Sequence, residues 1–209
     1  MDKILARSAE FENVMYDYFT LPSMDSSPKA ELARRVCFIS FEHAQSLKML
    51  LATRNFTSAI ALLRLQYECY VRGVWIYYAA NEDWIGKLNT ILTHESDIAA
   101  QKLPLLTAML KDLENKAPQN ALLPIIEFKE YSWKPLSSYV HGGLHAIDRH
   151  KRGYPIEILK MALMASNGVS GMAAMFGAVL SGHQGNVSSV SNTYYQFADC
   201  LNFKHAEQL

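Results

Sequence analysis

The chain has 209 residues, of which 50% are apolar and 19% charged. This composition supports one folded domain with a substantial core and excludes a disordered or low-complexity protein. Twenty basic residues balance twenty acidic ones, which excludes the strongly basic surface of a protein that coats nucleic acid. The three cysteines lie far apart, and the first residues lack the long apolar run of a secretory signal. We therefore expect no disulfide framework, no cysteine zinc site and a cytoplasmic location.

The hydrophobic pattern is helical along nearly the whole chain, without convincing strand-like alternation. We therefore predict an all-α fold, a single-domain bundle of about six to eight helices that spans residues 1–209. The first three helices are expected over roughly Ile4 to Phe19, Pro28 to Thr53, and Thr57 or Ser58 to Ala80. The third is apolar on nearly every side, which is typical of a helix at the centre of a bundle.

The middle of the chain shows several start and stop signals. Asn81 is expected to cap a short helix. A helix from about Ser96 to Asn115 is expected to bend or restart at Pro104, because proline removes a backbone hydrogen bond. The segment NALLPIIEFKEY is predicted to be helical, and Ser132 is expected to cap the helix that follows, SWKPLSSYVHGGLHAIDRH.

A long helix is predicted from Pro155 to about Leu180, and a last helix over roughly Val187 to Phe203. The long helix contains the uncharged stretch MALMASNGVSGMAAMFGAVL. Its serines, asparagine and glycines dilute the hydropathy and its flanks show no basic bias, so we expect no membrane insertion. Its glycines permit either the close approach of a neighbouring helix or a dimer interface.

Three charged residues recur inside the apolar third helix, namely Arg64, Glu68 and Arg72. Their spacing of four residues places them along one helix face. Charges in a core are costly unless they are paired. The ladder is therefore either scaffolding that pairs within itself, or a site in which an arginine faces a phosphate or carboxylate while Glu68 orients it.

A second polar group follows, with Lys134, Ser137 or Ser138, His141, His145 and Asp148. In an unbroken helix the lysine, both histidines and the aspartate share one stripe, although the two glycines after His141 are poor helix formers. The histidines and the aspartate are a weak candidate metal site. The alternatives are general acid–base chemistry by His141 and a hydrogen-bonded structural role.

The segments SFEHAQSLKMLL, FTSAIALLRLQYECYVRGVW and LSSYVHGGLHAIDRH resemble an uncharacterised family of bacterial helical proteins with an arginine–glutamate helix and a later Ser-x-x-x-His-Gly-Gly-like segment. In outline the chain is similar to the HEPN class, helical bundles of toxin–antitoxin and phage-defence systems, many of them dimeric, metal-independent ribonucleases. That resemblance implies a histidine that acts on the ribose hydroxyl or leaving oxygen and an arginine that stabilises phosphate charge. The HEPN arginine is replaced here by Lys134, which six residues separate from His141, and lysine lacks the bidentate fork.

Two functions follow as expectations. The first is a HEPN-like protein that binds and cleaves RNA, and its expected residues divide into two sets. The catalytic set is His141, Lys134 and Arg72, and the supporting or phosphate-binding set is Arg64, Glu68, His145 and Arg149. The second is a noncatalytic interaction or dimerisation module whose buried charges specify packing. We expect no cofactor and no membrane, a homodimer, and RNA, an antitoxin or another protein as partner.

Overall fold

The computed structural model describes residues 1–100 and 103–201, and all regular structure within them is helical. The expected all-α class is confirmed, but these residues form ten α-helices and one short 3-10 helix, so the expected six to eight is too low. The chain leaves the helical conformation around Pro104, which divides the helix expected from Ser96 to Asn115, and again at Gly142 and Gly143. The helices are α1 (Asp2–Phe19), α2 (Pro28–Ala52), α3 (Phe56–Tyr78), α4 (Glu82–Leu88), α5 (His94–Ala100), α6 (Leu106–Glu114), α7 (Gln119–Val140), α8 (Leu144–Arg152), α9 (Ile156–Leu180), α10 (Gln184–Gln196) and η1 (Ala198–Cys200).

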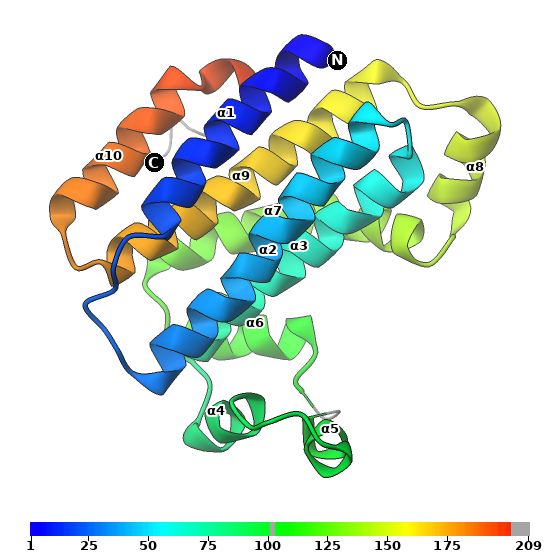
Figure 1. The fold of residues 1–209 in the computed structure, drawn as a ribbon. Helices are drawn as coiled ribbons and strands as arrows, with labels where there is room; N and C mark the ends of the chain where they lie inside the picture. The colour runs from blue at the N-terminus through cyan, green and yellow to red at the C-terminus, as the bar shows by residue number, and fades with distance from the viewer. Residues whose placement is uncertain (101–102, 202–209) are drawn as a thin grey trace.

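The centre of the bundle is the pair α2 and α3, which run antiparallel along most of their length (Figure 1). α9 packs against both, α1 and α10 cover the outer side of α9, and α6 and α7 cover α3. Fully buried aromatic side chains from three helices fill the space between these layers, including Phe11, Phe41, Tyr67 and Trp75. The third helix is therefore central, as its continuous apolar character predicts.

Local start signals set several helix boundaries. Ser27 accepts a hydrogen bond from the Ala30 amide at 3.4 Å while Pro28 fixes the first turn of α2. Asn81 accepts one from the Trp84 amide at 3.0 Å and so caps α4, as expected. The expected caps Thr57 and Ser58 are wrong, because α3 already begins at Phe56.

α7 differs most from its prediction. It is one helix that continues through Pro124 and Pro135, so Ser132 lies inside it and caps nothing. Each proline removes one backbone hydrogen bond, and the packing of α7 on α3 supports the helix through both positions. The helix ends at Val140 with His141 as its C-cap, and α8 starts after the glycines.

α9 has the length and hydropathy of a membrane-spanning helix, and 67% of its most apolar window is buried inside the bundle. Two of its glycines contact neighbouring elements of the same chain. A Cβ on Gly177 would lie 2.7 Å from the backbone of Phe19, and one on Gly171 would overlap the Tyr194 hydroxyl. Gly168 faces open space. Close intrachain packing therefore accounts for two of the three glycines.

The last helix ends earlier than predicted, at Gln196, and η1 follows it. The predicted end at Phe203 lies outside the described residues. η1 returns the chain to the start of α1, where Arg7 donates hydrogen bonds to the Gln196 carbonyl at 2.6 Å and to Asp199 at 3.3 Å. These contacts hold α10 and η1 against α1.

Candidate functional site

Arg64 connects α3 to α7 through three separate contacts. Its Nε donates a hydrogen bond to Glu68 Oε1 at 2.7 Å, and its Nη1 donates one to Ser137 Oγ at 2.6 Å. The guanidinium also lies over the Trp133 ring, with Cζ 4.0 Å from the ring centroid. A planar guanidinium makes these contacts together because its donors point in fixed directions while its face stays free to stack.

The chain produces this arrangement by simple helical spacing. Glu68 lies one turn after Arg64 on α3, and Trp133 and Ser137 lie one turn apart on α7, so each pair shares a helix face. The side chains of Arg64 and Glu68 are only 15% and 26% exposed. Partial burial reduces screening by water, so this ion pair fixes the guanidinium more firmly than a surface pair would.

His141 lies one helical turn beyond Ser137, at the C-cap of α7. Its backbone amide donates to the Ser137 carbonyl at 3.2 Å, and its side chain is exposed. Gly142 then adopts a φ of +62°, a left-handed conformation that glycine enters without a steric penalty. His141 is therefore exposed at a sharp turn, one helical turn after Ser137, the residue that accepts a hydrogen bond from Arg64. Arg64, Glu68, Trp133, Ser137 and His141 are called the α3–α7 corner below.

Ser138 has a different role from its neighbour Ser137. Its Oγ accepts a hydrogen bond from the His145 amide at 2.9 Å, and its carbonyl accepts one from the Gly143 amide at 2.7 Å. Both bonds fix the turn from α7 into α8. The sequence leaves the choice between the two serines open, and the contacts place Ser137 at the corner and Ser138 in the turn.

The α8 residues do not form the stripe that an unbroken helix would produce, because the glycine turn reorients the chain. The ring of His145 lies 6.4 Å from the ring of Tyr139, and Asp148 forms a salt bridge with Arg152, with Oδ1 2.8 Å from Nε. Residues 1–100 and 103–201 hold no group of three histidine, cysteine or acidic side chains that could bind a metal ion. The candidate metal ligands His141, His145 and Asp148 are thus not assembled.

Arg149 lies beside Tyr139. Burial raises the pKa of the Tyr139 hydroxyl, the nearby Tyr154 adds to that rise, and the Arg149 guanidinium opposes it. The structure therefore places Arg149 against a tyrosine near the end of α7, two residues before His141.

Arg72 lies two turns beyond Arg64, about 12 Å along the helix axis. Its Nε is buried without a hydrogen-bond partner in the part of the chain that the structure describes. The ladder is therefore only half formed, since Glu68 pairs with Arg64 and not with Arg72. Arg72 does not belong to the corner.

Lys134 is exposed on α7, next in the chain to Trp133. Both residues line a shallow cavity of about 280 Å³ between α6 and α7. The acidic residues Glu114 and Glu130 share this lining with Lys129 and Lys134, so the cavity carries charges of both signs.

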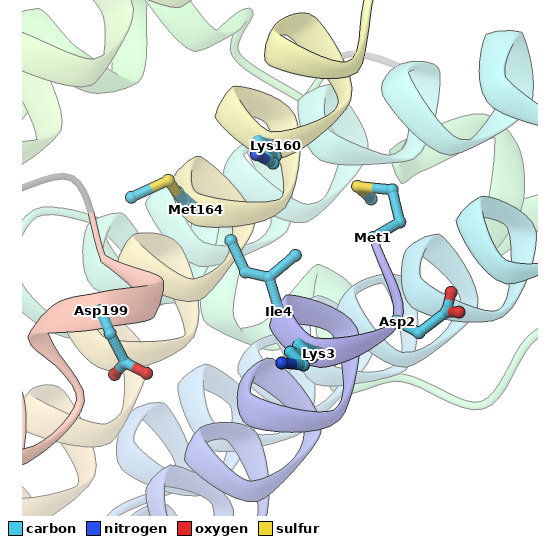
Figure 2. Close-up of a pocket in the computed structure, with 7 residues that line it drawn as sticks. All are labelled: Met1, Asp2, Lys3, Ile4, Lys160, Met164 and Asp199. Carbon is cyan, nitrogen blue, oxygen red and sulfur yellow. The ribbon is translucent and has the colours of Figure 1, made fainter.

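A larger cavity of about 530 Å³ lies away from these residues, where the start of α1 meets α9 (Figure 2). It is lined by the first four residues of the chain together with Lys160, Met164 and Asp199. None of the expected site residues lines it. The two cavities therefore do not join His141 to an arginine.

Residues 37–203 match a protein family described as Family of unknown function (DUF6988). The chain belongs to this family. No curated protein and no solved structure matches the sequence of this chain. The matched range includes all of α3, α7 and α8, and so the whole α3–α7 corner.

The sequence of this DUF6988 chain indicates part of the corner but not all of it. Arg64, Glu68 and His141 are expected from their spacing, whereas Trp133 is not. A tryptophan one turn before Ser137 shares its helix face, and this signal points to Trp133 once α7 is known to be continuous. The family match gives no evidence of a relationship to the HEPN class, so that resemblance stays a prediction.

Proposed function

We propose that this protein binds RNA at the α3–α7 corner and cleaves it without a metal ion, as a HEPN-like protein of a bacterial defence or toxin–antitoxin system. The observation that carries the proposal is the position of Arg64. Its guanidinium donates hydrogen bonds to Glu68 and to Ser137, and Ser137 lies one turn before the exposed His141 on α7. A fixed cation beside an accessible acid–base group is what phosphodiester cleavage requires.

The proposed reaction is an internal transfer within RNA. The ribose 2′ oxygen forms a bond to the neighbouring phosphorus, and the bond from phosphorus to the 5′ oxygen breaks. The products are a 2′,3′-cyclic phosphate and a 5′ hydroxyl. His141 takes the proton from the 2′ hydroxyl and delivers it to the departing 5′ oxygen. Arg64 and the exposed Lys134 oppose the charge that develops on the phosphate oxygens.

Glu68 acts through Arg64 in this scheme. Because Glu68 engages Nε and Ser137 engages Nη1, the guanidinium keeps one orientation and retains Nη2, which has no hydrogen-bond partner among the described residues. A donor that is already oriented loses less conformational freedom when an anion binds. Glu68 is therefore a positioning residue.

The test is incubation of purified protein with labelled total RNA in EDTA, with His141→Ala beside the wild type. His183→Ala is the matched control, because His183 is also an exposed histidine and lies at the start of α10. We expect cleavage by the wild type and the control, and a loss of about 10²–10⁴-fold in rate for His141→Ala.

Cleavage products with 2′,3′-cyclic phosphate ends would identify the internal transfer. If His141→Ala cleaves as fast as the control, the activity does not arise at the corner. If no variant binds or cleaves RNA at low salt, the ribonuclease proposal is wrong.

A second candidate is a noncatalytic interaction module, and the pairing of Arg64 favours it. A cation that is 15% exposed and already bonded to two partners also serves as scaffolding between two helices. In that case Arg64 variants change stability or partner binding, and RNA does not protect the corner from chemical modification.

A further inference from the structure

The segment formed by α4 and α5, called the arm below, exposes apolar side chains to solvent. Ile91 and Leu92 in the loop between the helices are 84% and 82% exposed, and Ile98 on α5 is 51% exposed. α5 packs mainly against α4, and Figure 1 shows the arm extending away from the long helices of the bundle. Within residues 1–100 and 103–201, no side chain covers Ile91, Leu92 or Ile98 enough to bury it.

α8 exposes a second apolar surface. Leu144 is 78% exposed and Ile147 is 61% exposed. They are three residues apart and therefore lie on the same face of the helix. Lys151, one turn after Ile147, lies on that face too. α8 packs mainly against α7 and projects at another edge of the molecule (Figure 1).

The two surfaces carry opposite charge. The arm contains four acidic residues, Glu82, Asp83, Glu95 and Asp97, against the single lysine Lys87. The last turn of α8 contains Arg149, His150, Lys151 and Arg152. Single exposed apolar residues are normal on a soluble protein. Two apolar clusters rimmed by complementary charge are the pattern of an interface.

Glu95 and Lys151 are the charges that match the apolar residues in position. Glu95 lies three residues before Ile98 on α5, and Lys151 lies four residues after Ile147 on α8, so each charge shares a helix face with an exposed isoleucine. The structure shows no ion pair for either charge among the described residues. With α5 and α8 packed antiparallel and Ile98 against Ile147, Glu95 therefore lies near Lys151.

We propose that the arm of one copy docks on α8 of a second copy, and that the reverse contact forms at the same time. A twofold axis generates both contacts from one, so the interface closes into a dimer and does not continue into a filament. The partner is a second copy of this chain, because both complementary halves are already present on it.

The test measures the dimer dissociation constant by sedimentation for Glu95→Lys, Lys151→Glu and the variant with both changes. We expect each single reversal to raise the dissociation constant about tenfold or more, since it places like charges together. The double variant restores the opposite pair and should bring the constant back toward the wild-type value. Glu42→Lys is the matched control, because Glu42 is exposed on α2, outside both surfaces.

Ile98→Glu and Ile147→Glu test the apolar part of the interface. Each is expected to weaken the dimer at least as much as the charge reversals, whereas Met49→Glu, at a residue 69% exposed on α2, should leave it unchanged. All substituted positions are exposed, and far-UV circular dichroism verifies that each variant keeps its helix content. A wild type that stays monomeric at high protein concentration, or a dimer that tolerates all four variants, overturns the proposal.

Discussion

At the scale of single residues, Arg64 contributes to stability as well as to the proposed site. Its replacement by lysine keeps the charge but removes the fork that reaches Glu68 and Ser137 together. We expect Arg64→Lys to lower the free energy of unfolding by about 1.5–3 kcal/mol, the usual contribution of hydrogen bonds to charged groups. Urea denaturation measures this change.

Arg35→Lys is the control for that measurement. Arg35 also pairs with a glutamate one turn away, Glu31, at 3.3 Å, but the side chains of both residues are about 60% exposed. An exposed pair of this kind contributes less than about 1 kcal/mol. Equal losses of unfolding free energy in the two arginine variants would show that neither the burial of Arg64 nor its hydrogen bond to Ser137 adds to stability.

The same residues show how far sequence reasoning reaches at this scale. The spacing of Arg64 and Glu68 is enough to predict their pairing, because residues four apart on a helix are neighbours. Nothing local predicts that Arg64 also reaches Ser137, since 73 residues separate them in the chain. A contact between two helices depends on how they pack, and the periodicity of either helix alone does not specify it.

At the scale of helices, the glycines of α9 measure how closely it packs. Gly177→Ala would place a Cβ 2.7 Å from the Phe19 Cα, and backbone atoms cannot move aside as the end of a side chain can. We expect a loss of about 1–3 kcal/mol in the free energy of unfolding, which is typical of an overpacked core.

Gly168→Ala is the matched substitution in the same helix. No atom lies within 4 Å of the added Cβ, so the change mainly improves helix propensity and should stabilise the protein by about 0.5–1 kcal/mol. Thermal or urea denaturation of both variants gives the comparison. If both substitutions shift stability in the same direction, α9 does not pack on α1 as described.

Helix boundaries divide into those with a local cause and those without one. Pro28 with Ser27, and Asn81, set the starts of α2 and α4 through contacts within one turn. α7 runs through two prolines because its packing on α3 outweighs the lost hydrogen bonds. Local signals therefore predict where a helix can begin, and packing decides where it continues.

At the scale of the whole molecule, a buried ion pair between α1 and α2 affects stability across the pH range. Lys48 Nζ donates to Glu12 and also to the Ala44 carbonyl at 3.1 Å, and both side chains of the pair are at least 90% buried. Burial raises the pKa of Glu12 and lowers the pKa of Lys48, in each case more than the partner's charge opposes. The ionised pair is therefore a net cost to the fold near neutral pH.

Removal of one partner and removal of both should thus have opposite results. Lys48→Met leaves an unpaired buried carboxylate and should cost about 3–5 kcal/mol at pH 7. The double variant Glu12→Leu with Lys48→Met should be neutral or more stable than the wild type by about 1–4 kcal/mol. Urea denaturation at pH 7 separates the two cases.

The pH dependence follows from the two pKa shifts. Because the folded state raises the pKa of Glu12, it binds more protons than the unfolded state as the pH rises through that carboxyl's range, and the wild type loses stability there. Because the folded state lowers the pKa of Lys48, the wild type regains stability as the pH rises from that lowered value toward the usual lysine range. The free energy of unfolding of the double variant should accordingly exceed that of the wild type most near neutral pH, and by less at pH 4. An advantage that grows on acidification would show that the pair stabilises the fold through its charges, in the manner of an exposed salt bridge.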